Sequence, residues 1–250
     1  MTTPAVSVVI PAYRAAAIIG PTIESAVAQT MRDFEVLVVD DCSPDDTVAV
    51  VEAYARADSR VQCLRHAANR GPGAARTTAL EAARGRYVAF LDSDDLWLPE
   101  KLERQIAFMN RRGAAFSYTQ YRRIDAAGAI VSSIVDVPAR LDYQALLCNT
   151  AIATSTVVVD RTMTGPFTMQ DAFYDDYVCW LALLKRGFIA HGLQEDLMRY
   201  RILARSWSRN KLRSAAQVWR IYRDVERLAL VPAAWVFTQY TWNAFRKYRG

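Results

Sequence analysis

The sequence is poor in the residues on which metal-binding and disulfide-stabilised proteins depend. It contains only two histidines, and none of its four cysteines stands at a Cys-x-x-Cys spacing. We therefore expect neither a zinc site nor a disulfide framework, and a reducing cytosol is the compartment that fits free thiols. No run of about 18 consecutive apolar residues is present, so no membrane-spanning helix is expected. The first residues also lack the basic and apolar segments of a signal peptide.

Two familiar phosphate-binding motifs are missing as well. The pattern G-x-x-x-x-G-K-[ST] occurs nowhere, and no G-x-G-x-x-G follows the first predicted strand. These absences argue against a P-loop nucleotidase and against a nicotinamide cofactor. What remains is the composition of an ordinary globular protein of 250 residues, 52% hydrophobic and 23% charged. That is enough for one large domain with an extension.

The charge is unevenly distributed along the chain. Residues 201–250 contain 11 lysines and arginines against 2 acids, whereas the whole chain has a net charge of only +5. The rest of the chain is therefore slightly acidic. An acidic body with a basic tail indicates an anionic surface as the partner of the tail.

Strands and helices are predicted to alternate through residues 6–91. Short β-branched runs that end at proline or aspartate predict buried strands, and apolar residues at helical spacing predict helices between them. The predicted strands are residues 6–10, 34–39, 61–64 and 87–91, and the predicted helices cover 19–27, 43–56 and 74–83. This order predicts an α/β fold with a largely parallel sheet covered on both faces, in which ligands bind at the carboxyl ends of the strands.

The second half of the sequence is less regular. The predicted helices are 99–113, 177–186, 208–228 and a last one after Pro232, and the predicted strands are 116–124, 129–134 and 156–159. The first two of these strands are joined by a predicted turn at residues 125–128.

Carboxylates cluster where two of the predicted strands end. Asp92, Asp94 and Asp95 stand within four residues, and like charges so close are tolerated best when a cation or a set of donors neutralises them. Magnesium takes oxygen ligands and usually shares them between one or two carboxylates and a substrate's phosphates. Asp40 and Asp41 repeat the arrangement on a neighbouring strand, where a carboxylate could accept hydrogen bonds from a base or a ribose. The alternatives are an acidic turn that caps a helix and an ordinary strand exit.

Two further segments carry groups suited to an anion or a proton. Residues 69–76 could bring backbone and the Arg76 guanidinium close to an anion, or could form a plain surface loop. Asp175 and Asp176 precede a predicted helix. A carboxylate pair raises one pKa, which suits a general base near neutral pH, although N-capping of the helix explains the pair equally well.

Together these segments resemble the family 2 glycosyltransferases, which have the GT-A fold. The resemblance covers about residues 5–215 and rests on V-S-V-V-I-P-A-Y-R, V-V-D-D-C-S-P-D-D-T, N-R-G-P-G-A-A-R, F-L-D-S-D-D and D-D-Y-V-C-W-L, in the family's order. The segment Y-R-I-L-A-R-S-W-S-R-N-K is similar to one in bacterial enzymes that build surface polysaccharides and O-antigen chains.

The resemblance implies a fold and a domain organisation. The fold is that of a nucleotide-diphospho-sugar transferase, α/β with a mainly parallel central sheet flanked by helices and a C-terminal helical extension. Residues 1–207 would form the GT-A catalytic domain, with a nucleotide-binding half at 1–98 and an acceptor-binding half at 99–207. Residues 208–250 would form a basic, aromatic helical extension.

The resemblance also implies roles for individual residues. Those on the nucleotide side are Pro11 and Tyr13 lining the base pocket, Asp41 bonding the base, Arg76 supporting base or diphosphate, and Asp92 holding the ribose or a metal-bound water. Those on the metal and acceptor side are Asp94 and Asp95 binding Mn²⁺ or Mg²⁺, Asp176 as general base, Trp180 beneath the acceptor, and Asp175, Arg201 and Lys211 near the acceptor or a phosphate. The family usually has glutamate at position 175, so this chain's shorter acid reaches less far toward the acceptor hydroxyl.

The implied reaction is an inverting, metal-dependent sugar transfer from a nucleotide-diphosphate sugar, with a UDP-sugar as the expected donor. The acceptor would be a hydroxyl of a growing bacterial surface glycan linked to a polyprenyl diphosphate. A single base opposite the leaving group implies one displacement, so an α-linked donor would give a β-glycoside. The enzyme would be cytoplasmic and peripheral on the inner face of the plasma membrane, and no nucleic acid is expected as a partner.

Two other classes of protein compete with this interpretation. A sugar-phosphate nucleotidyltransferase uses similar acids, but usually has a Gly-rich basic loop where this chain has P-A-Y-R after the first strand. A non-catalytic module that binds sugar nucleotides or a membrane surface is disfavoured by the intact acids at positions 92, 94, 95 and 176.

The basic tail predicts contact with a membrane surface. On a helical wheel Arg213, Arg220, Arg223 and Arg227 share one face, and the segment after Pro232 combines Trp, Tyr and Phe with Arg246 and lysine. This composition is typical of a helix that lies in a membrane interface. The alternative is that the apolar face docks on the catalytic domain while the arginines are simply solvated.

Overall fold

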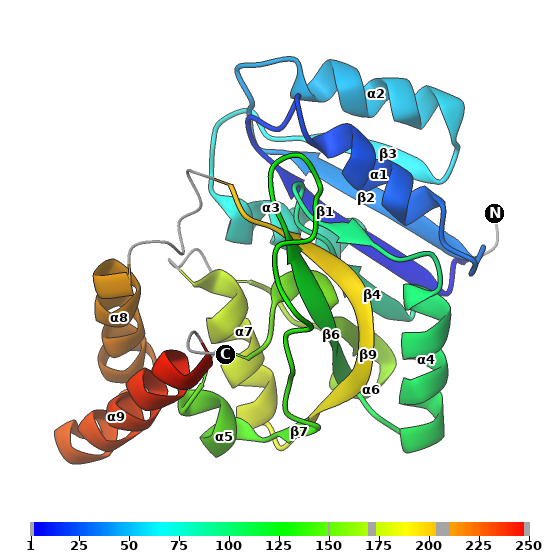
Figure 1. The fold of residues 1–250 in the computed structure, drawn as a ribbon. Coiled ribbons are helices and arrows are strands. Elements are labelled where there is room, and N and C mark those ends of the chain that lie inside the picture. The colour runs from blue at the N-terminus through cyan, green and yellow to red at the C-terminus, as the bar shows by residue number, and fades with distance from the viewer. Residues whose placement is uncertain (1–2, 150, 170–173, 204–210, 248–250) are drawn as a thin grey trace.

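The computed structural model describes residues 3–149, 151–169, 174–203 and 211–247 (Figure 1). Its N-terminal half alternates strands and helices as predicted. The elements are β1 (Val6–Ala12), α1 (Ile19–Val27), β2 (Phe34–Asp40), α2 (Thr47–Ala57), β3 (Val61–Arg65), α3 (Pro72–Ala82) and β4 (Tyr87–Phe90). The four strands are mutually parallel in the order β3-β2-β1-β4. Their carboxyl ends therefore share one edge of the sheet.

Two predicted boundaries in this half were wrong. β1 does not stop before Pro11 but continues through it. β4 pairs with β1 only as far as Val9, so beyond that residue β1 has a free edge, where proline costs least. Helix α2 begins at Thr47 rather than Ser43, because the Asp45 carboxylate accepts hydrogen bonds from the Thr47 amide and hydroxyl and holds the preceding residues in a turn.

The second half completes a mixed sheet. Its elements are β5 (Leu96–Trp97), α4 (Lys101–Arg112), β6 (Phe116–Ile124), β7 (Arg140–Leu141), α5 (Tyr143–Leu147), a 3₁₀ turn (Thr154–Thr156), β8 (Val158–Asp160), α6 (Arg161–Thr164), α7 (Asp175–Lys185) and β9 (Ala190–Arg201). The order continues from β4 through β8, β6 and β9 to β5, and β7 pairs with β9. Helix α4 ends as predicted at Gly113, which takes the left-handed conformation (φ 59°).

Two predictions for the second half were wrong. The predicted strand 129–134 makes only an isolated bridge from Ile130 to Ile124, and Ile130 and Val131 are 52% and 53% exposed. This segment has no core to cover. Conversely, the twelve-residue strand β9 was not predicted at all.

The sheet separates two hydrophobic cores, and helices cover both faces as predicted (Figure 1). Residues of α1, α2 and α4 pack on one face. Residues of α3, α5 and α7 pack on the other face, and the C-terminal helices join them there.

The C-terminal segment packs against the core on the side of α5 and α7. Helix α8 (Lys211–Arg220) is followed by a π-helical turn (Ile221–Val225) and by α9 (Leu230–Lys247). The predicted single helix to Leu228 is therefore interrupted, and Arg227 takes a positive φ of 55°. Tyr222 and Ala233 are fully buried in the same core as α7. The predicted domain boundary at 207/208 falls outside the described residues, and within the described part of the chain no helix is long and apolar enough to cross a bilayer.

Candidate active site

The site is built where the parallel strands end. Tyr13 follows β1, Asp41 follows β2 and Asp92 follows β4. Because these strands run parallel in adjacent positions, the fold brings the predicted nucleotide-side residues to one edge of the sheet. The N-terminus of α7 adds Asp175 and Asp176 to the same region through contacts with α3.

Arg76 joins the two halves of the site. It lies on α3 and is 6% exposed. Its Nη1 donates to Oδ2 of Asp175 and its Nη2 donates to Oδ1 of Asp92, both at 2.5 Å. Burial opposes its charge, but Asp92, Asp175 and Asp176 outweigh burial and raise the pKa of Arg76 above its usual value. One guanidinium thus balances acids from both halves of the predicted catalytic domain.

Asp176 has the environment of a base. Its Oδ2 accepts from the Thr154 hydroxyl at 2.5 Å and its Oδ1 accepts from the amide of Tyr177 at 2.7 Å. Burial and the neighbouring Asp175 raise the pKa of Asp176, and Arg76 and Thr154 only partly oppose them. A carboxylate with a raised pKa is a stronger proton acceptor near neutral pH.

The three aspartates of the turn after β4 differ in burial: Asp95 is fully buried, whereas Asp92 and Asp94 are partly exposed. Asp95 is 1% exposed, and its carboxylate accepts from the Ser155 hydroxyl at 2.5 Å and from the Arg201 amide at 2.9 Å. Both of its oxygens are therefore engaged in holding the turn. Asp92 and Asp94 are half-buried, and burial together with Asp92 raises the pKa of Asp94 to about 6.

This pair fits a divalent cation. A cation would relieve the repulsion between Asp92 and Asp94, and carboxylate oxygens are the ligands that Mg²⁺ and Mn²⁺ accept. Among the described residues, no group of three or more Asp, Glu, His and Cys side chains could hold a metal ion. Two carboxylates therefore need the oxygens of a substrate diphosphate to complete the ligand set.

On the nucleotide side the two aspartates after β2 have different tasks. The Asp41 carboxylate accepts from His66 Nδ1 at 2.7 Å, from the Arg70 amide at 2.9 Å and from the Gly71 amide at 2.7 Å. It thereby fixes the loop that leads into α3. Asp40 accepts from the Ser43 amide through Oδ2, while its buried Oδ1 has no partner within the described part of the chain. The spare acceptor thus lies on Asp40, although the family pattern assigned the base to Asp41.

The remaining nucleotide-side residues differ in accessibility. Pro11 is buried within β1, whereas Tyr13 is 44% exposed. The guanidinium carbon of Arg14 lies 5.3 Å from the centroid of the Tyr13 ring. Tyr13 therefore presents an aromatic surface at the end of β1.

Two of the predicted acceptor-side residues, Trp180 and Arg201, are buried and stabilise the structure around the acids. Trp180 is 1% exposed and meets the rings of Phe90 and Phe116 at centroid distances of 5.2 and 5.1 Å, so it forms part of the floor beneath the acids. Arg201 is buried, and its Nε donates to the carbonyl of Asp94 at 2.8 Å. It therefore stabilises the acidic turn. Lys211 begins α8, and its side chain lies outside the described residues.

Four residues near the site were not assigned a role from the sequence. They are His66, Thr154, Ser155 and Arg14, the last of which lies beside the Tyr13 ring. The segment T-S-T at 154–156 gave no signal in the sequence, because its hydroxyls meet their partners only in the folded protein. Ser155 bonds Asp95, 60 residues away, and Thr154 bonds Asp176, 22 residues away.

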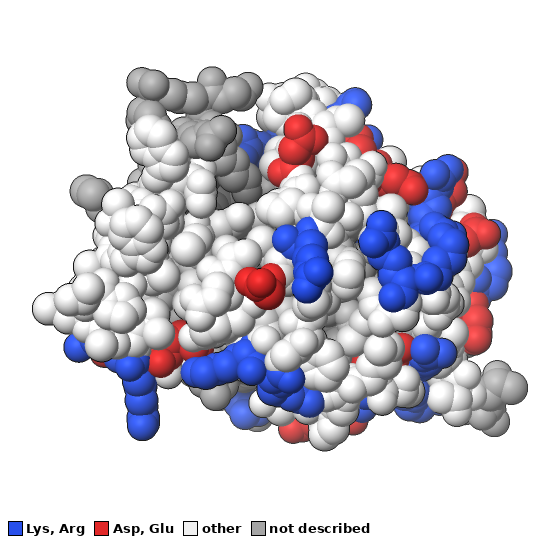
Figure 2. Space-filling view, turned by 90° about the horizontal axis from the view of Figure 1, so that it is seen from below, with Lys and Arg blue, Asp and Glu red and all other residues white. Residues whose placement is uncertain are grey.

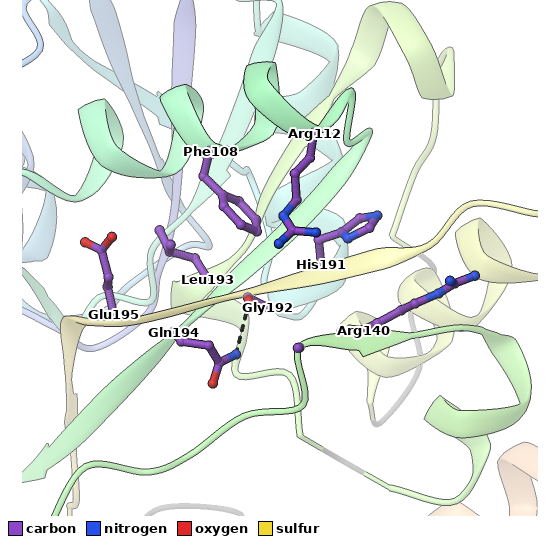
Figure 3. Close-up of a pocket in the computed structure, with 9 residues that line it drawn as sticks. Phe108, Arg112, Arg140, His191, Gly192, Leu193, Gln194 and Glu195 are labelled. Carbon is purple, nitrogen blue, oxygen red and sulfur yellow. Dashed lines mark hydrogen bonds between the residues drawn. The ribbon is translucent and has the colours of Figure 1, made fainter.

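A shallow groove of about 460 Å³ lies at the opposite end of β9 (Figure 3). Phe108 and Arg112 of α4 face His191 and Leu193 of β9 across it, and Arg140 extends beside it. None of the predicted site residues lines this groove. It is separate from the acids described above.

The sequence matches the model of a known family. Residues 7–157 match the family described as "Glycosyl transferase family 2". The glycosyltransferase TuaG of Bacillus subtilis, assigned to teichuronic acid biosynthesis, is 42% identical over 245 residues, covering 98% of this chain and 97% of the relative. WfgD of Escherichia coli, named UDP-Glc:alpha-D-GlcNAc-diphosphoundecaprenol beta-1,3-glucosyltransferase, is 38% identical over 220 residues, covering 88% of this chain and 85% of the relative.

Solved structures share the fold at low sequence identity. The mannosyltransferase PcManGT from Pyrobaculum calidifontis, in complex with GDP-Man and Mn²⁺, superimposes with a TM-score of 0.71 at 17% identity, covering 96% of this chain and 74% of that one. S. aureus TarS 1–349 in complex with UDP gives a TM-score of 0.68 at 18% identity, with coverages of 94% and 70%. These likenesses confirm the predicted GT-A fold, and the named relatives favour a transferase over both competing classes. The chain belongs to glycosyl transferase family 2 and is a glycosyltransferase.

Proposed function

We propose that this glycosyltransferase moves a sugar from a UDP-sugar to a hydroxyl of a lipid-diphosphate-linked glycan during assembly of a bacterial surface polysaccharide. The transfer inverts the anomeric configuration and requires Mn²⁺ or Mg²⁺. The observation that carries the proposal is the position of Arg76, whose guanidinium bonds Asp92 on one side and Asp175 on the other, next to Asp176. Donor-side and acceptor-side acids are thereby held within one charge network.

The donor side is suited to a nucleoside diphosphate. Tyr13 offers an exposed ring against which a base can stack, and the resemblance to the family assigns the hydrogen bond to the base to Asp41. The printed name of WfgD specifies a UDP-sugar donor, which supports UDP as the nucleotide. Asp92 and Asp94 would hold the divalent cation, and the cation would stabilise the charge that develops on the leaving diphosphate.

The acceptor side supplies a proton acceptor. Asp176 takes the proton from the attacking hydroxyl, and the new glycosidic bond forms as the bond to the leaving diphosphate breaks. Thr154 and the Tyr177 amide hold the Asp176 carboxylate in a fixed orientation, which leaves little reorganisation for the reaction step. One base and one displacement give inversion, so an α-linked donor yields a β-linked product.

The acceptor class is inferred from relatives. The printed name of WfgD specifies a diphosphoundecaprenol-linked acceptor, and that of TuaG specifies teichuronic acid biosynthesis. A lipid-linked acceptor would bring the enzyme to the inner face of the plasma membrane as a peripheral protein in the cytoplasm, where nucleotide-sugars are available.

A donor screen tests the proposal. The full chain is incubated with UDP-, GDP-, CDP- and dTDP-sugars and a synthetic lipid-diphosphate-linked monosaccharide, with Mn²⁺, Mg²⁺ or EDTA. We expect UDP release that needs both the acceptor and the cation, and a β-linked product by NMR. D176N, which keeps the size of the side chain but cannot take the proton, is the matched control and should form product about 10²–10⁴-fold more slowly. Release of pyrophosphate from a triphosphate, retention of configuration, or full activity in EDTA would each contradict the corresponding part of the proposal.

A further inference from the structure

Helix α9 has one face that the domain covers and one that it leaves bare. Ala233, Val236 and Tyr240 are 0%, 7% and 9% exposed and belong to the core. On the other side, Val231, Trp235 and Trp242 are 80%, 65% and 59% exposed. Positions 231, 235, 238 and 242 follow the i, i+4, i+7, i+11 spacing of a single helical stripe. We call Val231, Trp235, Thr238 and Trp242 the outer stripe.

The outer stripe carries no charge at all. Residues 228–245 contain no Asp, Glu, Lys or Arg, and no acid follows Glu226 in the sequence. A helix face that remains in water normally carries charged residues opposite its buried face. Among the residues that the structure describes, ten large hydrophobic side chains are exposed, and five of them lie between Val225 and Trp242. They are therefore concentrated on one small part of the molecule.

The charges around this face are predominantly basic. Arg220, Arg223 and Arg227 are exposed before α9, and Arg246 and Lys247 follow the uncharged segment. Helix α9 lies at the left edge of the molecule in Figure 1, and Figure 2, turned about the horizontal axis, shows a mostly uncharged region at the same edge.

We propose that the outer stripe of α9, together with Leu230, is the surface through which the enzyme rests on a bilayer that contains anionic lipids. The proposal rests on the lipid-linked acceptor of the proposed function and names the part of the molecule that meets the lipid. Tryptophan is the side chain best suited to the boundary between headgroups and acyl chains. The flanking cations complement anionic headgroups near the surface.

Point variants test the stripe without disturbing the core. The double variant W235Q/W242Q changes two exposed rings and leaves the buried face of α9 intact, unlike a truncation, which would uncover Tyr222 and the α7 side of the core. The matched control is I130Q/V131Q, which alters two exposed side chains of similar apolar character on the turn between β6 and β7.

The measurement is co-sedimentation of the full chain with vesicles of phosphatidylcholine and phosphatidylglycerol, without donor or acceptor. We expect binding of the wild-type chain and of the control, and a loss of about tenfold or more in the partition coefficient of W235Q/W242Q. Brominated lipids should quench wild-type tryptophan fluorescence and quench the double variant much less. UDP release with a water-soluble acceptor should be equal in all three proteins.

Two outcomes would overturn the proposal. Wild-type binding to vesicles equal to that of W235Q/W242Q would place the contact elsewhere. A concentration-dependent dimer in sedimentation velocity that W235Q/W242Q abolishes, with no vesicle binding, would make the stripe an interface between two copies of the chain. Because vesicle binding is measured without substrates, its failure is distinguishable from failure of the proposed sugar transfer, which the soluble acceptor reports.

Discussion

Replacing Arg76 by methionine, R76M, removes the cation that pairs with both Asp92 and Asp175. The side chain has similar length and can occupy the same buried volume, so packing is largely kept. The loss is electrostatic, because Asp92 and Asp175 each lose a 2.5 Å partner and Asp176 loses a nearby positive charge. Breaking a buried ion pair by removing one partner costs about 3–5 kcal/mol. At about 2–4 °C per kcal/mol for a domain of this size, the melting temperature should fall by roughly 10 °C.

The penalty of R76M should depend on pH in a definite direction. In the wild-type protein Arg76 lowers the pKa of Asp176, whose net pKa is nevertheless raised. Without Arg76 that pKa rises further, so the folded state binds more protons than the unfolded state above about pH 4. Stability then decreases as pH rises through the folded-state pKa. R76M should therefore lose more stability at pH 8 than at pH 5, by at least about 1 kcal/mol, the equivalent of roughly one pKa unit.

Urea denaturation at pH 5 and pH 8 checks this prediction. R104M is the matched control, since Arg104 pairs with Glu195 at 2.9 Å on the surface, where water screens the pair and its removal should change stability little. A loss below about 1 kcal/mol for R76M at pH 8, or an equal loss at both pH values, would refute the argument that Arg76 balances the buried acids.

Further substitutions test the other parts of the site. D176N should lower kcat by about 10²–10⁴-fold, or about 3–5 kcal/mol in barrier, while the Kd for UDP measured by calorimetry stays near that of the wild type; an equal loss of UDP affinity would make Asp176 a nucleotide ligand. T154V removes the hydroxyl that lowers the pKa of Asp176, so the acidic limb of the kcat/KM profile should move to higher pH, and an unchanged profile would argue against Asp176 as the base. D94A should abolish cation-dependent turnover without lowering the melting temperature, because it removes a carboxylate that burial and Asp92 destabilise; normal turnover in EDTA would exclude a metal role. K101M should raise the free energy of unfolding at pH 7 by about 1–3 kcal/mol, because burial holds the pKa of the fully buried Lys101 well below its usual value. The unfolded lysine binds a proton that the folded lysine does not, so the stability of the wild-type protein rises with pH. The stability advantage of K101M, measured as urea midpoints, should therefore shrink toward pH 9.5.

Local sequence was enough to predict the nucleotide-binding half. β1 and β2 are runs of Val, Leu and Ile that are buried along their whole length, and such runs form central strands because both faces are covered. The acids that follow them were recognisable because a polar pair directly after a buried run lies at the ligand-binding edge of a parallel sheet. The end of α4 was predictable because Gly113 adopts a left-handed conformation that other residues avoid.

Local sequence was not enough wherever a contact partner lies far along the chain. β9 is rich in charged residues and contains Gly192, and it is a strand because β6, β5 and β7 all pair with it. Residues 129–134 were wrongly predicted to form a strand for the same reason. Their apolar side chains favoured a strand, but no neighbouring element covers them.

The sequence by itself therefore determined which residues are candidates for the chemistry, since acids, Arg76 and aromatic residues stand in recognisable motifs. Tertiary structure alone decided how they work together. Arg76 and Asp175 are 99 residues apart, and only the packing of α7 against α3 makes one the counter-ion of the other. Tertiary structure also decided that Asp41 holds the loop before α3 whereas Asp40 bonds Ser43. In α9, the sequence does not distinguish the aromatic residues from one another. Which of them stabilise the core and which remain free for another surface depends on the side of the helix that meets α5, because burial is a property of neighbours and not of the residue itself.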